Sequence, residues 1–126
     1  MDRRLISSGS QWEERYGYSR AVVAGGRVYV SGTAPIMPDD AEPPADPYGQ
    51  ARRCLEIVSN ALAKAGASPN DVVRTRIFVV DRELMSEVLR AHGDLFAEAM
   101  PPCTGIVTDL MDPRWLVEIE VEAVLP

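Results

Sequence analysis

Residues 50–81 read "QARRCLEIVSNALAKAGASPNDVVRTRIFVVD" and place a helical pattern directly before a strand pattern. Asp46 and Pro47 supply a helix start just upstream, because Asp accepts free backbone N–H groups and Pro is tolerated in the first turn. Gly66 supplies a stop. Between these signals the apolar residues recur at helical spacing, at Cys54, Leu55, Val58, Ala61, Leu62 and Ala65. The pattern predicts one amphipathic helix.

The second half of this segment predicts a strand that leads into another helix. Residues 71–81 alternate, with one side formed by Val73, Thr75, Ile77 and Val79 and the other by Arg74, Arg76 and Phe78. Asp81 is a candidate cap for the second helix, whose apolar stripe is expected to contain Met85, Val88, Leu89, Leu95, Phe96 and Ala99. His92 falls on this stripe, so we expect a partly buried histidine rather than a catalytic one.

Further strands are predicted on both sides of this segment. Ser19–Ala24 and Arg27–Ser31 flank Gly25 and Gly26, and a Gly pair readily adopts the positive φ angles of a tight hairpin. Residues 35–47 hold many prolines and acidic residues and predict a surface loop. Residues 103–108 and 115–124 predict two last strands. The final strand alternates Val117, Ile119, Val121 and Ala123 with Glu118, Glu120 and Glu122.

The order strand, strand, helix, strand, helix, strand, strand predicts an α+β fold, with a mixed sheet that carries both helices on one face. The length of 126 residues suits a single domain, residues 1–126. The other sheet face then has no layer of its own chain to cover it. Association with copies of itself through that face is the simplest solution, so we expect an oligomer.

Composition disfavours several classes of function. The net charge of −6 argues against nucleic-acid binding, which depends on Lys and Arg. The longest apolar runs, such as Ile77–Val80, are far shorter than the roughly 20 residues of a membrane span. The start "MDRRLISSGS" lacks the apolar stretch of a signal peptide, so we expect a cytoplasmic protein without a membrane partner. Two cysteines and one histidine are too few for a zinc site, and no metal is expected.

Four segments resemble the Rid family, also called YjgF, the reactive intermediate deaminases. They are "GYSRAV" at residues 17–22, "VYVSGTAP" at residues 28–35, the segment 50–81, and "LVEIEVEAV" at residues 116–124. The resemblance implies a chorismate mutase-like fold, a homotrimer formed through the open sheet face, and small ligand clefts between subunits. Many members hydrolyse reactive enamines and imines, such as 2-aminoacrylate, to a keto acid and ammonia without a cofactor. A small-molecule metabolite is therefore the expected partner, and no cofactor is expected.

The resemblance also implies the site residues. Glu118 matches the family glutamate that positions the attacking water, and is the expected catalytic residue. Tyr18 matches the tyrosine that contacts the ligand, and Ser31 matches the serine that ends the hairpin strand. Backbone N–H and C=O groups would come from Gly32 and from the segment Cys103, Thr104 and Gly105.

Cys103 departs from the family pattern. Deaminase members usually have Pro, a small residue and then Arg, and this Arg binds the substrate carboxylate; here Pro101 and Pro102 precede Cys103. A guanidinium offers a planar charged fork, whereas a thiol offers one weak donor. Gly105 stands where some members have a reactive cysteine.

Cys103 has three possible roles, as a nucleophile, as cleft lining or as a packing residue. The nucleophile is disfavoured, because the only candidate base is His92, on a stripe expected to face the core. Cleft lining is the favoured role.

Glu118 also has two interpretations. Glu118, Glu120 and Glu122 form one strand face, which is commonly solvated. Burial in an interface beside the other carboxylates would instead raise the pKa of Glu118 and suit it to proton transfer. The resemblance favours the functional interpretation. Tyr18 has the alternative of a buried aromatic, and we expect surface or interface salt bridges from Arg20, Arg74, Arg76 and Arg114.

Three functions compete at this point. The first is hydrolysis of a reactive enamine or imine. The second is a non-enzymatic ligand-binding or regulatory trimer that has lost the hydrolytic activity. The presence of Cys103 in place of the arginine favours this second function. The third is a ribonuclease, a label given to some relatives, which the acidic charge and the lone His92 disfavour.

Overall fold

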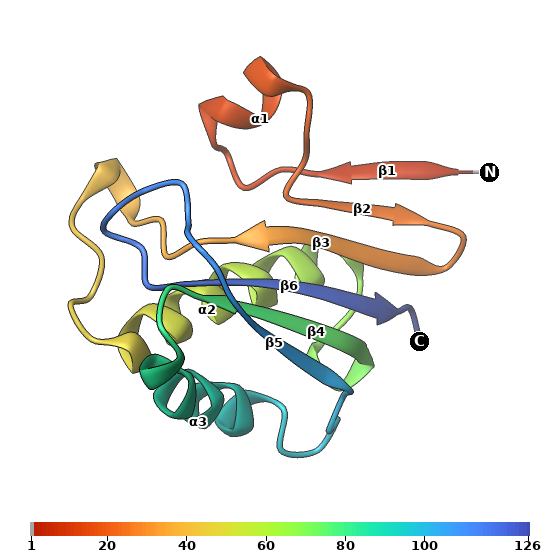
Figure 1. Cartoon of the computed structure of the whole chain (residues 1–126). Coiled ribbons are helices and arrows are strands. Elements are labelled where there is room, and N and C mark those ends of the chain that lie inside the picture. The colour runs from red at the N-terminus through yellow and green to blue at the C-terminus, as the bar shows by residue number, and fades with distance from the viewer. Residues whose placement is uncertain (1) are drawn as a thin grey trace.

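The computed structural model describes residues 2–126 as a six-stranded sheet with two long helices on one face, which confirms the predicted α+β class (Figure 1). The strands lie in the order β1-β2-β3-β6-β4-β5. Within the described residues, β4 and β5 are the one parallel pair, and the other neighbours are antiparallel. Their bounds are β1 Arg3–Ile6, β2 Ala21–Ala24, β3 Arg27–Thr33, β4 Val72–Val79, β5 Cys103–Val107 and β6 Val117–Val124.

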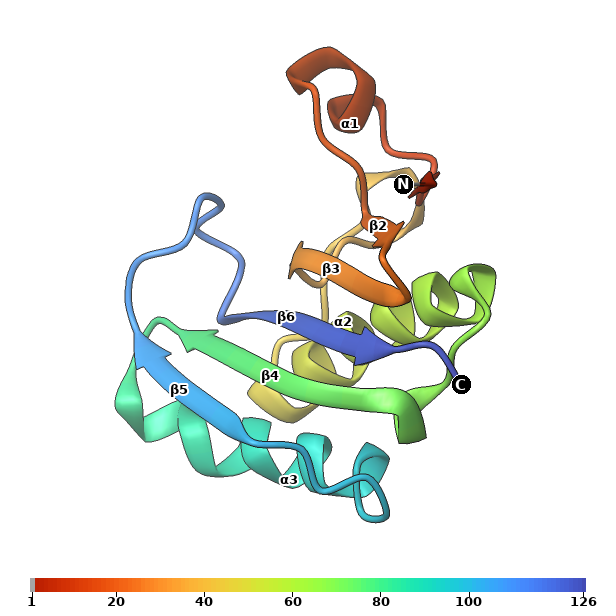
Figure 2. The same ribbon diagram turned by 90° about the vertical axis from the view of Figure 1, so that its right-hand side faces the viewer.

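Helices α2 (Pro47–Ala65) and α3 (Met85–Leu95) lie side by side beneath the sheet (Figure 2). Helix α2 begins where the sequence predicts, because the Asp46 carboxylate accepts a 2.8 Å hydrogen bond from the Gly49 N–H. It ends at Gly66, whose φ of 90° few other residues adopt. All the apolar residues of the predicted stripe are buried, at Cys54, Leu55, Val58, Ala61, Leu62 and Ala65.

The predicted alternation along β4 is wrong at its first residue. Val73 was expected on the same side as Thr75, Ile77 and Val79, which are buried, but its own side chain is 39% exposed. The pairing of β4 with β6 shifts register between Val72 and Arg74, as at a β-bulge, where one extra residue interrupts the alternation. Val72 therefore joins the buried side, while Thr75, Ile77 and Val79 lie there as predicted.

The second helix begins later than predicted. Asp81 caps the short 3-10 turn η3 (Arg82–Leu84), accepting a hydrogen bond from the Glu83 N–H, and α3 itself begins at Met85. Leu89 was expected in the buried stripe but is 43% exposed, since the helix faces the core through Val88, Ala91 and His92. His92 is buried and lies 2.8 Å from Thr75 Oγ1 through Nε2, which confirms its predicted position.

The hairpin and the two last strands are confirmed. Gly25 and Gly26 connect β2 to β3 with φ angles of 60° and 74°. Between Pro35 and Asp46 the chain forms one 3-10 turn, η1 (Pro38–Asp40), and otherwise no regular structure; a further turn, η2 (Pro69–Asp71), precedes β4. No helix within residues 2–126 is long and apolar enough to cross a membrane.

Two elements near the N-terminus were not predicted. Strand β1 adds an edge beside β2, and the short helix α1 (Gln11–Tyr16) stands at that edge, apart from α2 and α3 (Figure 1). The Ser10 hydroxyl caps α1 by accepting from the Trp12 N–H at 3.2 Å, and Gly17 ends it with a φ of 75°. Four and six residues are too few to show a clear period in the sequence.

His92 makes the folding stability depend on pH. Burial lowers the pKa of His92 below its ordinary 6.5, so its contribution to stability is complete above this value and is lost as pH falls through the lowered pKa. His92→Gln keeps a hydrogen-bonding group beside Thr75 but does not titrate. We expect urea unfolding between about pH 8 and about pH 5 to show a steeper loss of stability in the wild type than in this variant. Parallel pH dependences in the two proteins would contradict a buried, neutral His92.

Candidate functional site

The three glutamates of β6 lie on the sheet face that α2 and α3 leave uncovered. Val117, Ile119, Val121 and Ala123 are buried toward the helices, while the intervening Glu118, Glu120 and Glu122 are half-buried on the opposite side. We call this uncovered side the open face. In register with the glutamates, β4 places Phe78 beside Glu118, Arg76 beside Glu120 and Arg74 beside Glu122. The alternation predicted for the last strand is confirmed.

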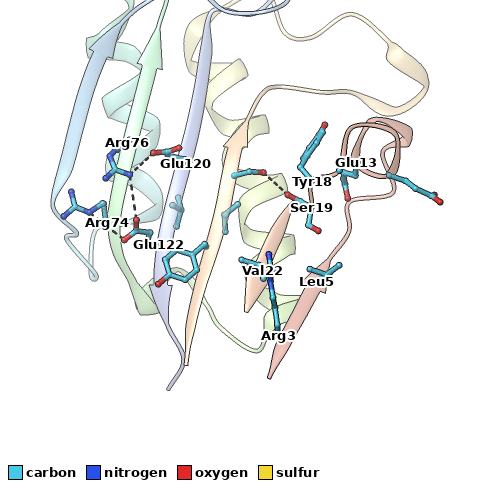
Figure 3. A pocket seen from close by; sticks show the side chains of 16 residues that line it. Arg3, Leu5, Glu13, Tyr18, Ser19, Val22, Arg74, Arg76, Glu120 and Glu122 are labelled. Atoms are coloured by element: carbon cyan, nitrogen blue, oxygen red, sulfur yellow. Dashed lines mark hydrogen bonds and ion pairs between the residues drawn. The ribbon is translucent and has the colours of Figure 1, made fainter. Parts of the chain in front are cut away.

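Two of the three glutamates form ion pairs with arginines of β4 (Figure 3). Arg76 Nη1 lies 2.7 Å from Glu120 Oε1 and 3.9 Å from Glu122, and Arg74 Nε lies 3.8 Å from Glu122. These partners confirm Arg74 and Arg76 as salt-bridge residues. Within residues 2–126, the Glu118 carboxylate has no ion pair or hydrogen bond.

Glu118 lies instead against Gly32, where β3 departs from regular pairing. The register of β3 with β6 shifts between Val30 and Thr33, and Gly32 lies within this irregularity. A methyl group on Gly32 would overlap Glu118 Oε1 and lie 3.1 Å from its carboxyl carbon. Only glycine leaves room for the carboxylate, so the structure brings two of the predicted site residues together.

Arg20 joins the same cluster from the segment before β2. Its Nη1 donates hydrogen bonds of 2.9 Å to the Gly32 carbonyl and to Thr33 Oγ1. Its guanidinium carbon lies 5.9 Å from the centre of the Tyr18 ring, within cation–π range. Ser31 Oγ lies 3.1 Å from the carbonyls of both Ser19 and Arg20, which fixes β3 to this segment.

The sequence interpretation of Arg20 as a surface or interface residue was wrong. Its side chain is buried, with 7% exposed, and its Nε has no hydrogen-bond partner within residues 2–126. The sequence pattern gave no sign that Arg20 is buried. In an alternating strand one of two neighbouring residues is exposed, whereas Arg20 and Ala21 are both buried. Arg114, by contrast, forms ion pairs with Asp40, Glu42 and Asp112, as expected of a salt-bridge residue.

The surroundings of Glu118 shift the pKa of its carboxyl. Burial raises the pKa of Glu118 above its ordinary value, the positive charge of Arg20 opposes this, and the nearby Glu120 adds to it. A raised pKa was expected from the neighbouring carboxylates; burial is the larger cause. Within residues 2–126, no group of three or more His, Cys, Asp or Glu side chains is arranged to hold a metal ion.

A wide hollow of about 980 Å³ lies between α1 and the open face (Figure 3). Tyr18 and Ser31 of the predicted site line it, together with the charged pairs of Arg76, Glu120 and Glu122. Glu118 is not among its lining residues. The hollow therefore adjoins the Glu118 cluster and does not contain it.

The β5 part of the predicted site lies apart from Glu118 in one chain. Strand β5 is the outer edge of the sheet, and β4 separates it from β6. Cys103 and Gly105 pair with Thr75 and Ile77 and so share the helix side, where a Cβ on Gly105 would lie 2.6 Å from Met85 Cε. Thr104 pairs with Arg76 on the open face. Cys103 is exposed, whereas His92 is buried with its Nε2 2.8 Å from Thr75 Oγ1. No hydrogen bond joins the Cys103 thiol to His92 within residues 2–126.

Gly32→Ala tests the close approach of Glu118 to β3. The added methyl group should push the flexible Glu118 side chain away from the bulge and leave the fold intact, because only side-chain atoms obstruct it. Gly93→Ala is the control, since its Cβ meets nothing within 4 Å and Ala in a helix stabilises by about 0.5–1 kcal/mol relative to Gly. Carboxyl NMR signals check this: the Glu118 signal should move in the first variant alone. An unmoved signal in Gly32→Ala would contradict the contact.

Comparison with known proteins gives one consistent family. Residues 10–125 match the family described as Endoribonuclease L-PSP. A protein of Streptomyces coelicolor, SCO2049, is 39% identical over 121 residues, covering 95% of this chain and 90% of its own. The Escherichia coli 2-iminobutanoate/2-iminopropanoate deaminase is 33% identical over 109 residues, covering 85% of this chain and 84% of its own.

A solved structure agrees with this assignment. Rv2704 from Mycobacterium tuberculosis, described as a member of the YjgF/YER057c/UK114 family, superposes with a TM-score of 0.88 at 40% identity. The match covers 98% of this chain and 100% of Rv2704. The chain therefore belongs to the endoribonuclease L-PSP family, also known as the YjgF or Rid family.

Proposed function

We propose that the protein hydrolyses a small enamine or imine metabolite in clefts between three copies of the chain, with Glu118 positioning and activating the water. The proposal rests on the half-buried Glu118 carboxylate of the open face, which forms no ion pair within residues 2–126 and lies against Gly32 at the β3 irregularity. Support also comes from the family and from the E. coli relative, whose name describes a deaminase of imino acids. Tyr18, Ser31 and the Gly32 backbone complete the ligand contacts, together with a neighbouring copy's segment of Cys103, Thr104 and Gly105.

The chemistry requires one group that both gives and takes a proton. Imine hydrolysis protonates the nitrogen, adds water to the carbon of the C=N bond, and then releases ammonia as the C=O bond forms. One water oxygen enters the carbonyl product, and the nitrogen leaves with its hydrogens. Because its pKa is raised by burial, the Glu118 carboxyl is suited to accept a proton from water and return it to the leaving nitrogen.

Cys103 determines the substrate class in this proposal. It stands where the deaminase pattern has an arginine for the substrate carboxylate, and a neutral thiol does not form an ion pair with a carboxylate. We therefore propose a small polar or carbonyl-type imine or enamine that does not depend on a carboxylate for binding.

The open face supports assembly through copies of the chain. One register row crosses β1, β2, β3 and β6, through Leu5, Val22, Tyr29 and Glu122. Leu5 and Tyr29 are 64% and 41% exposed in the single chain. Burial of this row against another copy would remove apolar area from water, which favours a homotrimer through the open face.

A non-enzymatic ligand-binding trimer is the second candidate, and the absent arginine at Cys103 favours it. In that case the clefts bind a metabolite and Glu118 is dispensable for the biological effect. The family name also refers to an endoribonuclease. The net charge of −6 and the carboxylates of the open face oppose binding to RNA phosphates.

Glu118→Gln tests the enzymatic proposal. We expect the wild type to accelerate ammonia release from an uncharged imine more than from 2-aminoacrylate generated in place. The rate of ammonia release should fall about 100-fold or more in the variant, because general acid–base catalysis contributes on that order. Glu83→Gln is the control, since Glu83 is exposed on the turn before α3. Equal rates in the wild type and Glu118→Gln would exclude the catalytic role, and no acceleration of either compound would favour the binding protein.

Tyr29→Glu tests the assembly. Sedimentation equilibrium of the wild type should give three times the chain mass of 13.8 kDa. The new carboxylate beside Glu122 should dissociate the assembly, because like charges would be desolvated together. Leu89→Glu, at a residue of similar exposure on α3, should leave the mass unchanged. A wild-type mass equal to one chain would contradict the homotrimer.

A further inference from the structure

We propose that Arg20 is the positioning residue of this site, a buried cation that keeps the Glu118 carboxylate charged and fixes the β3 bulge against which it lies. The catalytic meaning of this inference rests on the proposed function. The charge of Glu118 can be measured without any substrate.

Gly32 connects the two side chains. The Arg20 guanidinium donates to the Gly32 carbonyl, and the Gly32 Cα faces the Glu118 carboxylate. The second acceptor, Thr33 Oγ1, itself lies 2.8 Å from the Ser31 carbonyl, so both acceptors belong to the end of β3. Because the buried Nη1 group donates to two points of this segment, it sets the path of the bulge, and with it the space left for Glu118.

Arg20 retains donors that the protein does not use. Its Nε is buried without a partner, and only Nη1 donates hydrogen bonds within residues 2–126. A buried donor without a partner is rare in folded proteins and calls for a reason. Within residues 2–126 the Glu118 carboxylate has no hydrogen bond or ion pair either, and the positive charge of Arg20 favours its ionised form.

The charged groups around Glu118 come from few elements. Glu120, on the same strand, opposes ionisation of Glu118 and is itself paired with Arg76 of β4. On the β4 side the register partner of Glu118 is the uncharged Phe78. On the helix side, the nearby Cys54 thiol has its pKa raised mainly by burial and also by the Glu118 charge.

The charge of Arg20 also lowers the pKa of Glu13 in α1, but hydrogen bonds have the larger lowering effect there. Burial raises the pKa of Glu13, and hydrogen bonds from Ser7 and Ser8 lower it together with the charge of Arg20, so that the net direction is downward. Glu118 has no such hydrogen bonds, and Arg20 is the group that favours its ionised form. Arg20 is therefore one of several groups that favour the ionised form of Glu13, but the main one that favours the ionised form of Glu118.

The test is a carboxyl NMR titration in protein labelled with ¹³C at the glutamate carboxyls, with the Glu118 signal assigned by its loss in Glu118→Gln. Arg20→Gln and Arg20→Met remove the charge, and Arg20→Lys keeps it on a shorter side chain without the planar guanidinium. We expect the Glu118 midpoint to move to higher pH in both neutral variants, and by a smaller amount in Arg20→Lys. Arg27→Gln, which removes one positive charge at the exposed hairpin, should leave the midpoint unchanged.

An unchanged Glu118 midpoint in every Arg20 variant that folds would overturn the inference. A shift equal to that of Arg27→Gln would also overturn it, because the effect would then be one of total charge. Where hydrolysis is measurable, the acid limb of its pH profile should move with the midpoint, whereas a purely structural role would lower the rate without moving the profile. If no hydrolysis is found while the midpoint still shifts, the proposed function fails and the role of Arg20 stands.

Discussion

The structure depends on the alternation of β6, which makes one strand the centre of two different surfaces. Val117, Ile119, Val121 and Ala123 are buried toward α2, and the glutamates of β6 lie on the opposite side. Because β6 lies between β3 and β4, this alternation fixes which residues of both neighbours face the helices. The helices therefore complete the core on one side only, and the other side carries the charges and the candidate site.

Three glutamates on one strand have different environments because their neighbours differ. Arg74 and Arg76 of β4 pair with Glu122 and Glu120, and such partly exposed pairs contribute little to stability. Glu118 has Phe78 on that side and the glycine bulge on the other, so burial acts on it without a direct partner. Its distinct environment arises from the register of the sheet, from burial and from the charge of Arg20.

Long, regular patterns were predictable from the sequence. Helix α2 and strand β6 follow their periods over 19 and 8 residues, and the boundaries of α2 follow from Asp46 and Gly66. Strand β6 begins at Val117, two residues later than predicted. The pattern does not show where a register shifts, so Val73 was placed on the wrong side of β4. It also does not show how a helix is rotated about its axis relative to the core. Leu89 was therefore expected in the buried stripe, although it is exposed. Arg20 was missed because its burial depends on Gly32 and Thr33, which reach it only through the pairing of β2 and β3.

We propose that the open face is an interface between copies and that Glu118 lies in the cleft this interface forms. A crystal structure of the assembled protein is the decisive measurement. We expect three copies whose open faces meet, with a neighbouring copy beside Glu118 and Gly32. A crystal in which the open face contacts only solvent, and Glu118 faces bulk water in every copy, would contradict it.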